Sequence, residues 1–321
     1  MTFPRRPRFR RAEKMAPMRL TPRDEEILRA VFRHRFLRSN QIARIVPGSR
    51  QQLLRRLQSL YHHRYLERPR CQLNYFEHGV SRSMVYGLGN RGVAFLRRRE
   101  NIPAHRLDWS VRNRSVQRFF LEHALLIAEV MLAFEETCRH RGDVRLLADD
   151  ALPLPDVTRR QREPFHWSVR LPGGASLGVI PDKVFALESY DGTGRINRTL
   201  YFLEADRGTM PVQRSGFATS SFARKLLAYE ATWTQDVHRS RFGFSRMRVL
   251  TVTTSAQRLE NLTAAAADLG RGKGVFLFID AAAVSSSTDL LAQPWRKSDG
   301  STEFLSSRSP GPRLQAPPST G

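Results

Sequence analysis

The stretch from residue 180 to residue 229 decides the fold: it reads I-P-D-K-V-F-A-L (180–187), T-L-Y-F-L-E-A-D-R-G-T-M (199–210) and S-F-A-R-K-L-L-A-Y (221–229). The first two segments are rich in β-branched and aromatic residues and flank a polar turn with two glycines, which is typical of a β-hairpin. In an antiparallel pair, the start of one strand lies beside the end of the next. The sequence therefore predicts that Asp182 meets Glu204 and Asp206 at one end of a sheet.

These side chains suggest a chemistry. Glu204 and Asp206 are two residues apart, so strand alternation places both on one face. The helix predicted after the hairpin adds Lys225. Clustered carboxylates and an amine suit a hard divalent cation that activates water against a phosphate. We therefore expect Asp182, Glu204, Asp206 and Lys225 to be catalytic, with Mg²⁺ or Mn²⁺ as cofactor.

The charge of the chain is unevenly distributed. The 321 residues carry a net charge of +23, with a pI of about 11.3. Residues 1–114 hold 27 Lys and Arg against 8 Asp and Glu, whereas residues 115–321 hold 26 against 22. A codon bias toward arginine would explain the 48 Arg against 5 Lys, but not this asymmetry. A basic N-terminal third predicts a polyanionic partner, nucleic acid before membrane.

Several classes of protein are excluded by the composition. Two cysteines, Cys71 and Cys138, are too few for a disulfide framework or a zinc site. No apolar run approaches the roughly 20 residues of a membrane span, and the basic N-terminus lacks the apolar core of a signal peptide. We expect a cytoplasmic protein without a membrane partner.

The N-terminal third has the layout of a winged helix-turn-helix. Capping signals at Thr21 and Ser49 begin two helices, a short helix lies between them, and two strand-like runs, 65–68 and 83–88, follow. The third helix would enter the major groove, with the hairpin on the backbone. The alternative is a winged helix used for protein contact. Base-edge contacts are expected from Arg50, Gln51 and Arg55, and phosphate contacts from Arg56, Arg64 and Arg82.

The rest of the chain predicts an α/β sheet with helices packed on it, and an α+β class overall. A helix over 115–140 precedes several strands, and then helix, strand, helix and strand end near residue 280. The domains expected are a disordered basic arm (1–18), the winged helix (19–100), a linker (101–114), the α/β domain (115–280) and a disordered tail (281–321).

The order of Pro181-Asp182 and Glu204-x-Asp206 resembles the PD-(D/E)xK nuclease signature, and the element order resembles the core of that fold. The resemblance implies that Asp182 and Glu204 hold Mg²⁺. Asp206 occupies the usual lysine position, but some members of that superfamily supply the lysine from the next helix, where Lys225 stands. Others add an acidic ligand on the first helix, where Glu122 stands.

More specifically, the chain is similar to the replication-relaxation family of actinobacterial plasmids and integrative elements. The similarity lies in L-T-P-R-D (20–24), Y-G-L-G-N-R-G (86–92), E-H-A-L-L-I (122–127), I-P-D (180–182) and F-L-E-A-D-R-G-T-M (202–210). It implies DNA-associated work on mobile elements. DNA is the expected partner, with plasmid replication or transfer proteins and a second copy of the chain as further candidates.

The function is left open between two classes. One is a DNA-binding protein with a metal-dependent endonuclease domain. The other is a non-catalytic replication accessory or transcriptional regulator whose nuclease-like domain only docks partners. A repressor with a ligand-sensing domain would need an apolar pocket, and the sequence gives no sign of one.

Overall fold

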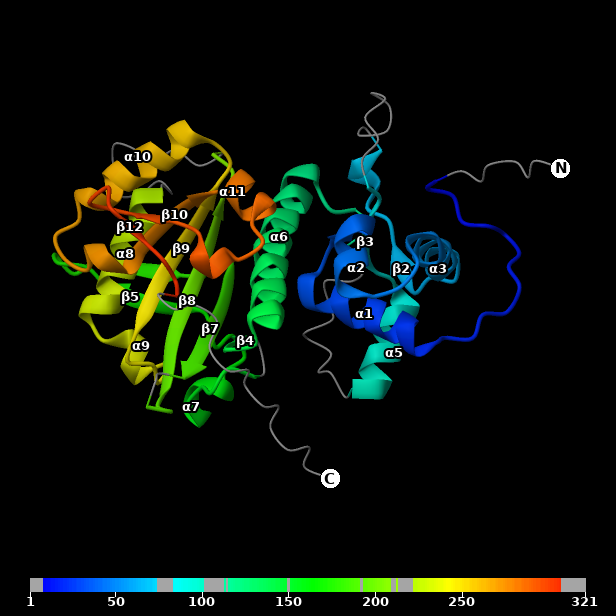
Figure 1. Cartoon of the computed structure of the whole chain (residues 1–321), viewed down its shortest axis with the longest axis horizontal. Coiled ribbons are helices and arrows are strands. Elements are labelled where there is room, and N and C mark those ends of the chain that lie inside the picture. Colours follow the sequence, from blue (N-terminus) through cyan, green and yellow to red (C-terminus); the bar gives the residue numbers. More distant parts are fainter. Residues whose placement is uncertain are drawn as a thin grey trace. The chain divides into compact units, whose positions relative to one another are not determined.

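The computed structural model describes residues 8–73, 83–100, 113, 115–148, 151–190, 193–208, 212 and 222–306. The chain divides into two compact units, Met1–Ala128 and Glu129–Gly321. Figure 1 shows helices and sheets in both, so the predicted α+β class is confirmed. Within the described ranges, no helix combines the length and the apolar character needed to cross a membrane.

The first unit combines helices with a small antiparallel sheet. Its elements are α1 (Pro22–His34), β1 (Leu37–Arg38), α2 (Ser39–Ile45), α3 (Arg50–His62), β2 (Leu66–Glu67), the 3₁₀ turn η1 (Arg70–Gln72), β3 (Val85–Leu88) and α5 (Asn90–Glu100). The strands pair in the order β1-β3-β2. Helices α1 and α3 begin at the predicted caps, since the Thr21 and Ser49 hydroxyls accept bonds from backbone N–H groups.

The boundary between the units falls inside α6 (Arg118–Arg141) and not in the predicted linker. Leu121 and Leu125 of α6 pack with Phe36 and Val85 in one buried cluster. The first turns of α6 therefore complete the core of the first unit. Of the predicted linker, residues 101–112 and 114 lie outside the described residues.

The second unit is built on a seven-stranded sheet with the order β12-β11-β10-β9-β8-β7-β4. Strands β7 and β8 form the predicted antiparallel hairpin, and β8, β9 and β10 are parallel neighbours. The bounds of the central strands are β4 (Val144–Ala148), β7 (Lys183–Tyr190), β8 (Ile196–Asp206), β9 (Met247–Thr253) and β10 (Phe276–Asp280). Parallel strands need crossover connections, and α8 (Phe222–Thr234) and α10 (Ala256–Ala267) supply them.

Both faces of the sheet are buried. One face carries Phe202 and Val249, which share a core cluster with Leu226 of α8 and Leu262 of α10. A separate hairpin of β5 (Trp167–Arg170) and β6 (Ser176–Val179) adds to the same core. Two short helices complete the unit: α7 (Asp156–Arg159) lies between β4 and β5, and α9 (Val237–Ser240) lies between α8 and β9. On the other face, the ring of Phe134 lies 4.8 Å from that of Phe185.

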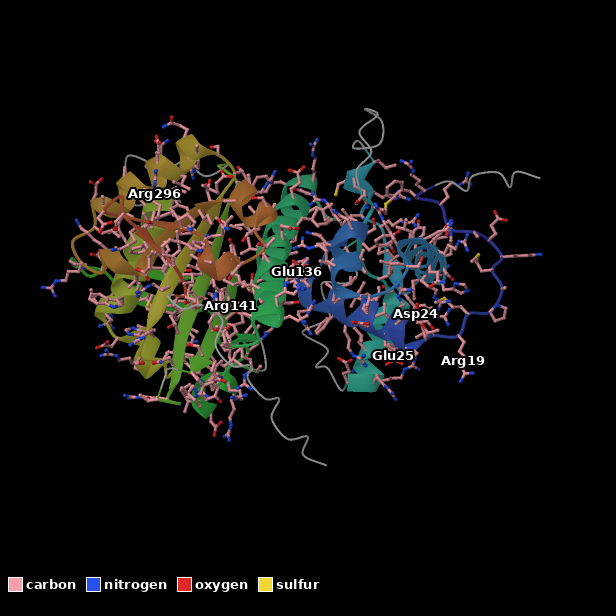
Figure 2. All side chains as sticks on the ribbon, in the orientation of Figure 1. Arg19, Asp24, Glu25, Glu136, Arg141 and Arg296 are labelled. Carbon is pink, nitrogen blue, oxygen red and sulfur yellow. The ribbon has the colours of Figure 1, made fainter. Side chains whose placement is uncertain are left out.

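The disordered tail predicted from residue 281 is wrong for residues 281–306. They form α11 (Ala281–Ser286), the 3₁₀ turn η6 (Leu290–Ala292), β11 (Trp295–Lys297) and β12 (Thr302–Glu303). Trp295 is fully buried and stacks with Phe134, and Arg141 (Figure 2) pairs with Asp289 at 3.1 Å. The Ala/Ser-rich composition hid these anchors, and residues 307–321 lie outside the described part of the chain.

Replacing Trp295 should test whether the C-terminal strands belong to the core. Trp295→Ala should lower the free energy of unfolding by about 3–5 kcal/mol, because it opens a cavity at a fully buried site. Trp233→Ala is the matched control, since Trp233 is 38% exposed and should cost much less. Equal urea midpoints for the two variants would contradict the packing described here.

Candidate nucleic-acid interface and candidate carboxylate site

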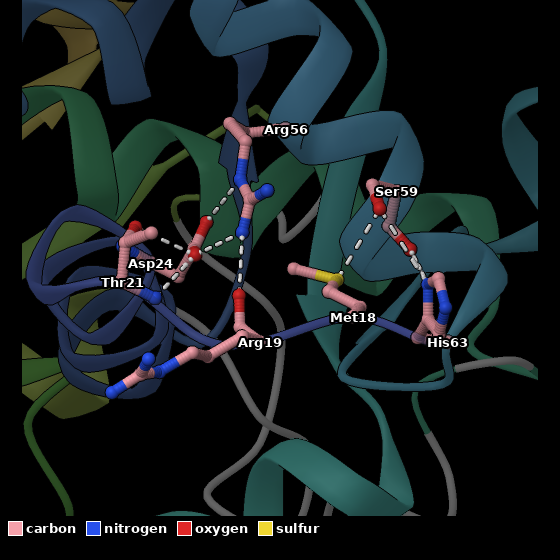
Figure 3. A network of polar contacts seen from close by, with 7 residues as sticks. All are labelled: Met18, Arg19, Thr21, Asp24, Arg56, Ser59 and His63. Atoms are coloured by element: carbon pink, nitrogen blue, oxygen red, sulfur yellow. Dashed lines mark hydrogen bonds and ion pairs between the residues drawn. The ribbon is translucent and has the colours of Figure 1, made fainter. Parts of the chain in front are cut away.

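A buried ion pair fixes helix α3 against helix α1. Asp24 is fully buried and accepts hydrogen bonds from the hydroxyl and the backbone N–H of Thr21, at 2.7 and 2.8 Å. Arg56 of α3 donates to both oxygens of the same carboxylate, with Nε 2.9 Å from Oδ1 (Figure 3). Burial alone would raise the pKa of Asp24, but the bonds from Arg56 and Thr21 outweigh it and lower that pKa. One carboxylate thus caps α1 and orients α3.

This pair changes the role expected of Arg56. The sequence assigned Arg56 to a DNA phosphate, whereas the structure engages its guanidinium with Asp24 and with the carbonyl oxygen of Arg19. A partner 32 positions away in the sequence could not be read from helical periodicity. Of the other predicted phosphate contacts, Arg64 is exposed just after α3, and Arg82 lies outside the described residues.

The opposite side of α3 is open to solvent. Leu53, Leu57 and Leu60 point into the core, as predicted. The three side chains expected to contact base edges, Arg50, Gln51 and Arg55, are exposed. Leu54 lies on the same side with 42% of its surface exposed. The outward face of α3 is therefore polar and basic, with one apolar side chain within it.

The N-terminal segment lies along α3, in contrast to the free arm predicted for residues 1–18. The carbonyl oxygen of Ala16 accepts a bond of 2.9 Å from Nε2 of His63, and Sδ of Met18 accepts one of 3.2 Å from the Ser59 hydroxyl. Arg56, Ser59 and His63 follow helical spacing and share one side of α3. The segment covers that side and leaves the outward face uncovered. Residues 1–7 are outside the described ranges.

In the second unit, the hairpin register brings Asp182 beside Glu204. Lys183 pairs with Leu203, and the N–H of Asp182 donates to the Leu203 carbonyl at 3.1 Å. Oδ2 of Asp182 accepts a 2.8 Å bond from the N–H of Ala205. Because residues opposite each other in an antiparallel pair share a face, the two carboxylates lie on the same face, at the carboxyl edge of β8.

Glu204 is buried, with 2% of its surface exposed, and has two partners on α8. The Lys225 ammonium donates to its Oε2, and the Tyr229 hydroxyl donates to its Oε1 at 2.6 Å. Burial, opposed by Lys225 and reinforced by the charge of Asp182, raises the pKa of Glu204 to about 7. Burial would lower the pKa of Lys225, but Glu204 and Asp182 outweigh it and raise that pKa. The structure thus joins Asp182, Glu204 and Lys225 in one electrostatic group.

Asp206 is engaged in a separate contact. Its carboxylate accepts bonds from Nε and Nη2 of Arg258 at 2.7 and 2.9 Å, and one from the Thr253 hydroxyl at 3.3 Å. Asp206 lies on the same strand face as Glu204, as predicted, but its two oxygens hold a guanidinium. The residue at the usual lysine position of the nuclease pattern therefore forms an ion pair with Arg258 at the edge of the sheet, and its charge also contributes to the raised pKa of Lys225.

Glu122, the predicted additional metal ligand, belongs to the first unit. It forms an ion pair with Arg118 at 3.0 Å, one turn away on α6. Asp182, Glu204 and Lys225, by contrast, all belong to the second unit.

Tyr229 and Arg258 were missed by sequence reasoning, although each left a signal. Tyr229 is four residues after Lys225, the spacing that places two side chains on one helical face. Arg258 lies in the first turn of α10, which begins where β9 ends. Helices that follow parallel strands begin at the carboxyl edge of the sheet, where ligand sites of α/β folds lie.

The edge offers two neighbouring carboxylates as possible metal ligands, those of Asp182 and Glu204. Across the described ranges, no group of three or more His, Cys, Asp or Glu side chains is arranged to hold a metal. Mg²⁺ is commonly held by one or two carboxylates, with water and substrate phosphates completing its shell. Asp182 and Glu204 would supply those two carboxylates. In this structure the Glu204 oxygens accept hydrogen bonds from Lys225 and Tyr229.

The raised pKa of Glu204 predicts a pH-dependent stability. Its folded-state pKa of about 7 lies above the usual 4.5, so the folded protein binds that proton more tightly than the unfolded chain. The free energy of unfolding should therefore fall as pH rises from about 4.5 to 7, by an amount on the order of 1–3 kcal/mol. Glu204→Gln should remove this component from urea denaturation curves recorded in EDTA.

The exposed Glu260 serves as control for that experiment. Glu260→Gln should preserve the pH profile of the wild type. A wild-type profile that Glu204→Gln leaves unchanged would show that Glu204 ionises normally.

The comparisons with known proteins concern the whole chain. Residues 28–246, more than half of its length, match the model of the family described as replication-relaxation. Comparison with curated proteins and with solved structures gives no match. The family match agrees with the resemblance noted in the sequence, and the chain belongs to the replication-relaxation family.

Proposed function

We propose that this chain is a DNA-binding protein that acts in the replication or transfer of plasmids or mobile elements. The family to which it belongs supports that biological setting. The observation that carries DNA binding is the outward face of α3, where Arg50, Gln51 and Arg55 are exposed on a helix fixed by the buried Arg56–Asp24 pair.

The architecture of the first unit supports a winged helix-turn-helix. Helices α2 and α3 follow one another through a short turn, and β3 lies between β1 and β2 in an antiparallel sheet. In such domains the second helix of the motif enters the major groove, and the hairpin contacts the backbone. We assign these roles to α3 and to the β2–β3 pair.

The side chains on α3 suit base recognition. Arginine pairs with two acceptors of guanine, and glutamine pairs with adenine. Leu54, exposed between them, suits the methyl group of thymine. Plasmid replication or transfer proteins and a second copy of this chain are proposed as further partners.

Arg55→Ala and Gln51→Ala are expected to test base reading. On duplexes selected from a random library, each should weaken binding by about 1–3 kcal/mol and relax the preference at one base position. Arg98→Ala, at an exposed position on α5, removes one charge from the same unit and should leave the base preference unchanged. An unaltered preference in both α3 variants would reject α3 as the reading helix.

A metal-dependent endonuclease activity is a second candidate, supported by the meeting of Asp182, Glu204 and Lys225 at one edge of the sheet. Asp182 and Glu204 would hold Mg²⁺, which supplies polarisation of a phosphate and a more acidic bound water. Lys225 would stabilise the negative charge that develops on the phosphate, and Tyr229 would hold the Glu204 carboxylate in position. The alternative is a non-catalytic accessory in which the same group only stabilises the sheet edge.

Incubation with supercoiled plasmid and Mg²⁺ or Mn²⁺ should separate these alternatives. For the endonuclease we expect cleavage that falls at least about a hundredfold in Asp182→Asn and Glu204→Gln, which remove metal-binding charge. Asp268→Asn, at an exposed position, should retain the activity. Calorimetric titration with Mn²⁺ should show binding to the wild type and none to Asp182→Asn. Absence of cleavage with either metal would leave the accessory role.

A further inference from the structure

A pocket of about 460 Å³ lies in the first unit, between the N-terminal segment, the end of α3 and β2. Pockets that take small-molecule groups typically measure about 300–1,000 Å³. Five arginines line it: Arg10, Arg11, Arg64, Arg68 and Arg70. Glu67 is the one carboxylate among its lining residues.

The arginines at the base of this pocket are held rigidly. Arg11 donates to Glu67 at 2.6 Å, and Arg68 donates to the Tyr86 hydroxyl at 3.1 Å. The guanidiniums of Arg11 and Arg68 both lie over the ring of Tyr61, at 4.4 and 4.1 Å from its centre. Two cations thus lie over one aromatic ring, and one of them, Arg11, is paired with a carboxylate.

Two of the arginines that line the pocket carry buried donor atoms without an acceptor. Arg68 is 7% exposed, and its Nε has no hydrogen-bond partner among the described residues; the same holds for Nη1 of Arg11. Burying an unsatisfied charged donor is costly. The lining of five arginines and one carboxylate favours an anion with several acceptor oxygens. Arginine matches phosphate in this respect through its fork of N–H groups.

We propose that this arginine pocket binds a backbone phosphate of duplex DNA with its attached sugar, an assignment that rests on the proposed DNA binding. Arg64 lies two residues beyond His62, where α3 ends. The seven positions from Arg55 to His62 span about 10 Å along the helix axis at 1.5 Å per residue, comparable with the roughly 12 Å width of the major groove. A duplex read by Arg55 therefore has a phosphate strand within reach of the pocket. The N-terminal segment, which supplies Arg10 and Arg11, becomes part of the binding site.

The salt dependence of DNA affinity tests this assignment. Removal of one phosphate contact should reduce the slope of log K against log salt by about 0.9, so affinity should fall about 3.5-fold less between 50 and 200 mM salt. Arg64→Gln/Arg70→Gln changes two exposed side chains and should show this reduced slope with unchanged base preference. In ethylation interference, particular phosphates should matter for the wild type and not for this variant.

Arg160→Gln/Arg162→Gln is the matched control, because it removes the same two charges from exposed positions of the second unit. It should keep the wild-type slope. If the pocket variant also keeps that slope and its interference pattern, the pocket assignment is wrong while DNA binding stands. A wild type that binds no duplex would overturn both. Equal binding of inorganic phosphate and duplex, competing for the pocket, would show a free-anion site and reject the backbone assignment.

Discussion

The alternation of side chains along β8 is the constraint on which the second unit depends. One face of this strand carries Leu200 and Phe202 into the core, and the same face then carries Glu204 and Asp206 to the carboxyl edge. A slip of one residue in the register would move all four to the other face. Because both faces of the sheet are buried, apolar character alone does not choose between them, and the pairing of β8 with β7 and β9 places the carboxylates on the face reached by Lys225 and Arg258.

At that edge, each carboxylate is compensated by a helix that follows a strand. Glu204 meets Lys225 on α8, and Asp206 meets Arg258 on α10. The two pairs are chemically different, since Glu204 is held by an ammonium and a phenol and Asp206 by a bidentate guanidinium. Burial nevertheless raises the pKa of Glu204 against the effect of these two partners, and both oxygens of Asp206 accept bonds from Arg258.

Local patterns in the sequence were enough to predict several elements of the fold and part of the carboxylate site. The hairpin, the caps of α1 and α3, and the convergence of Asp182 with Glu204 follow from alternation, capping chemistry and antiparallel geometry. The Arg56–Asp24 pair was not predictable in this way, because it joins two helices whose packing angle is a tertiary property. Trp295 was missed for a related reason: its surroundings look like a polar tail, and only the whole sheet reveals the site that it fills. Tyr229 could have been found from its spacing to Lys225.

The N-terminal segment is attached to the first unit largely through its peptide backbone. The carbonyl oxygens of Arg8, Ala16 and Arg19 accept the bonds from Arg68, His63 and Arg56. Every amino acid offers such an oxygen, so these three contacts tolerate replacement of the residues that supply them. They do not tolerate a change in the number of residues in the segment, which would put the oxygens out of step with their donors.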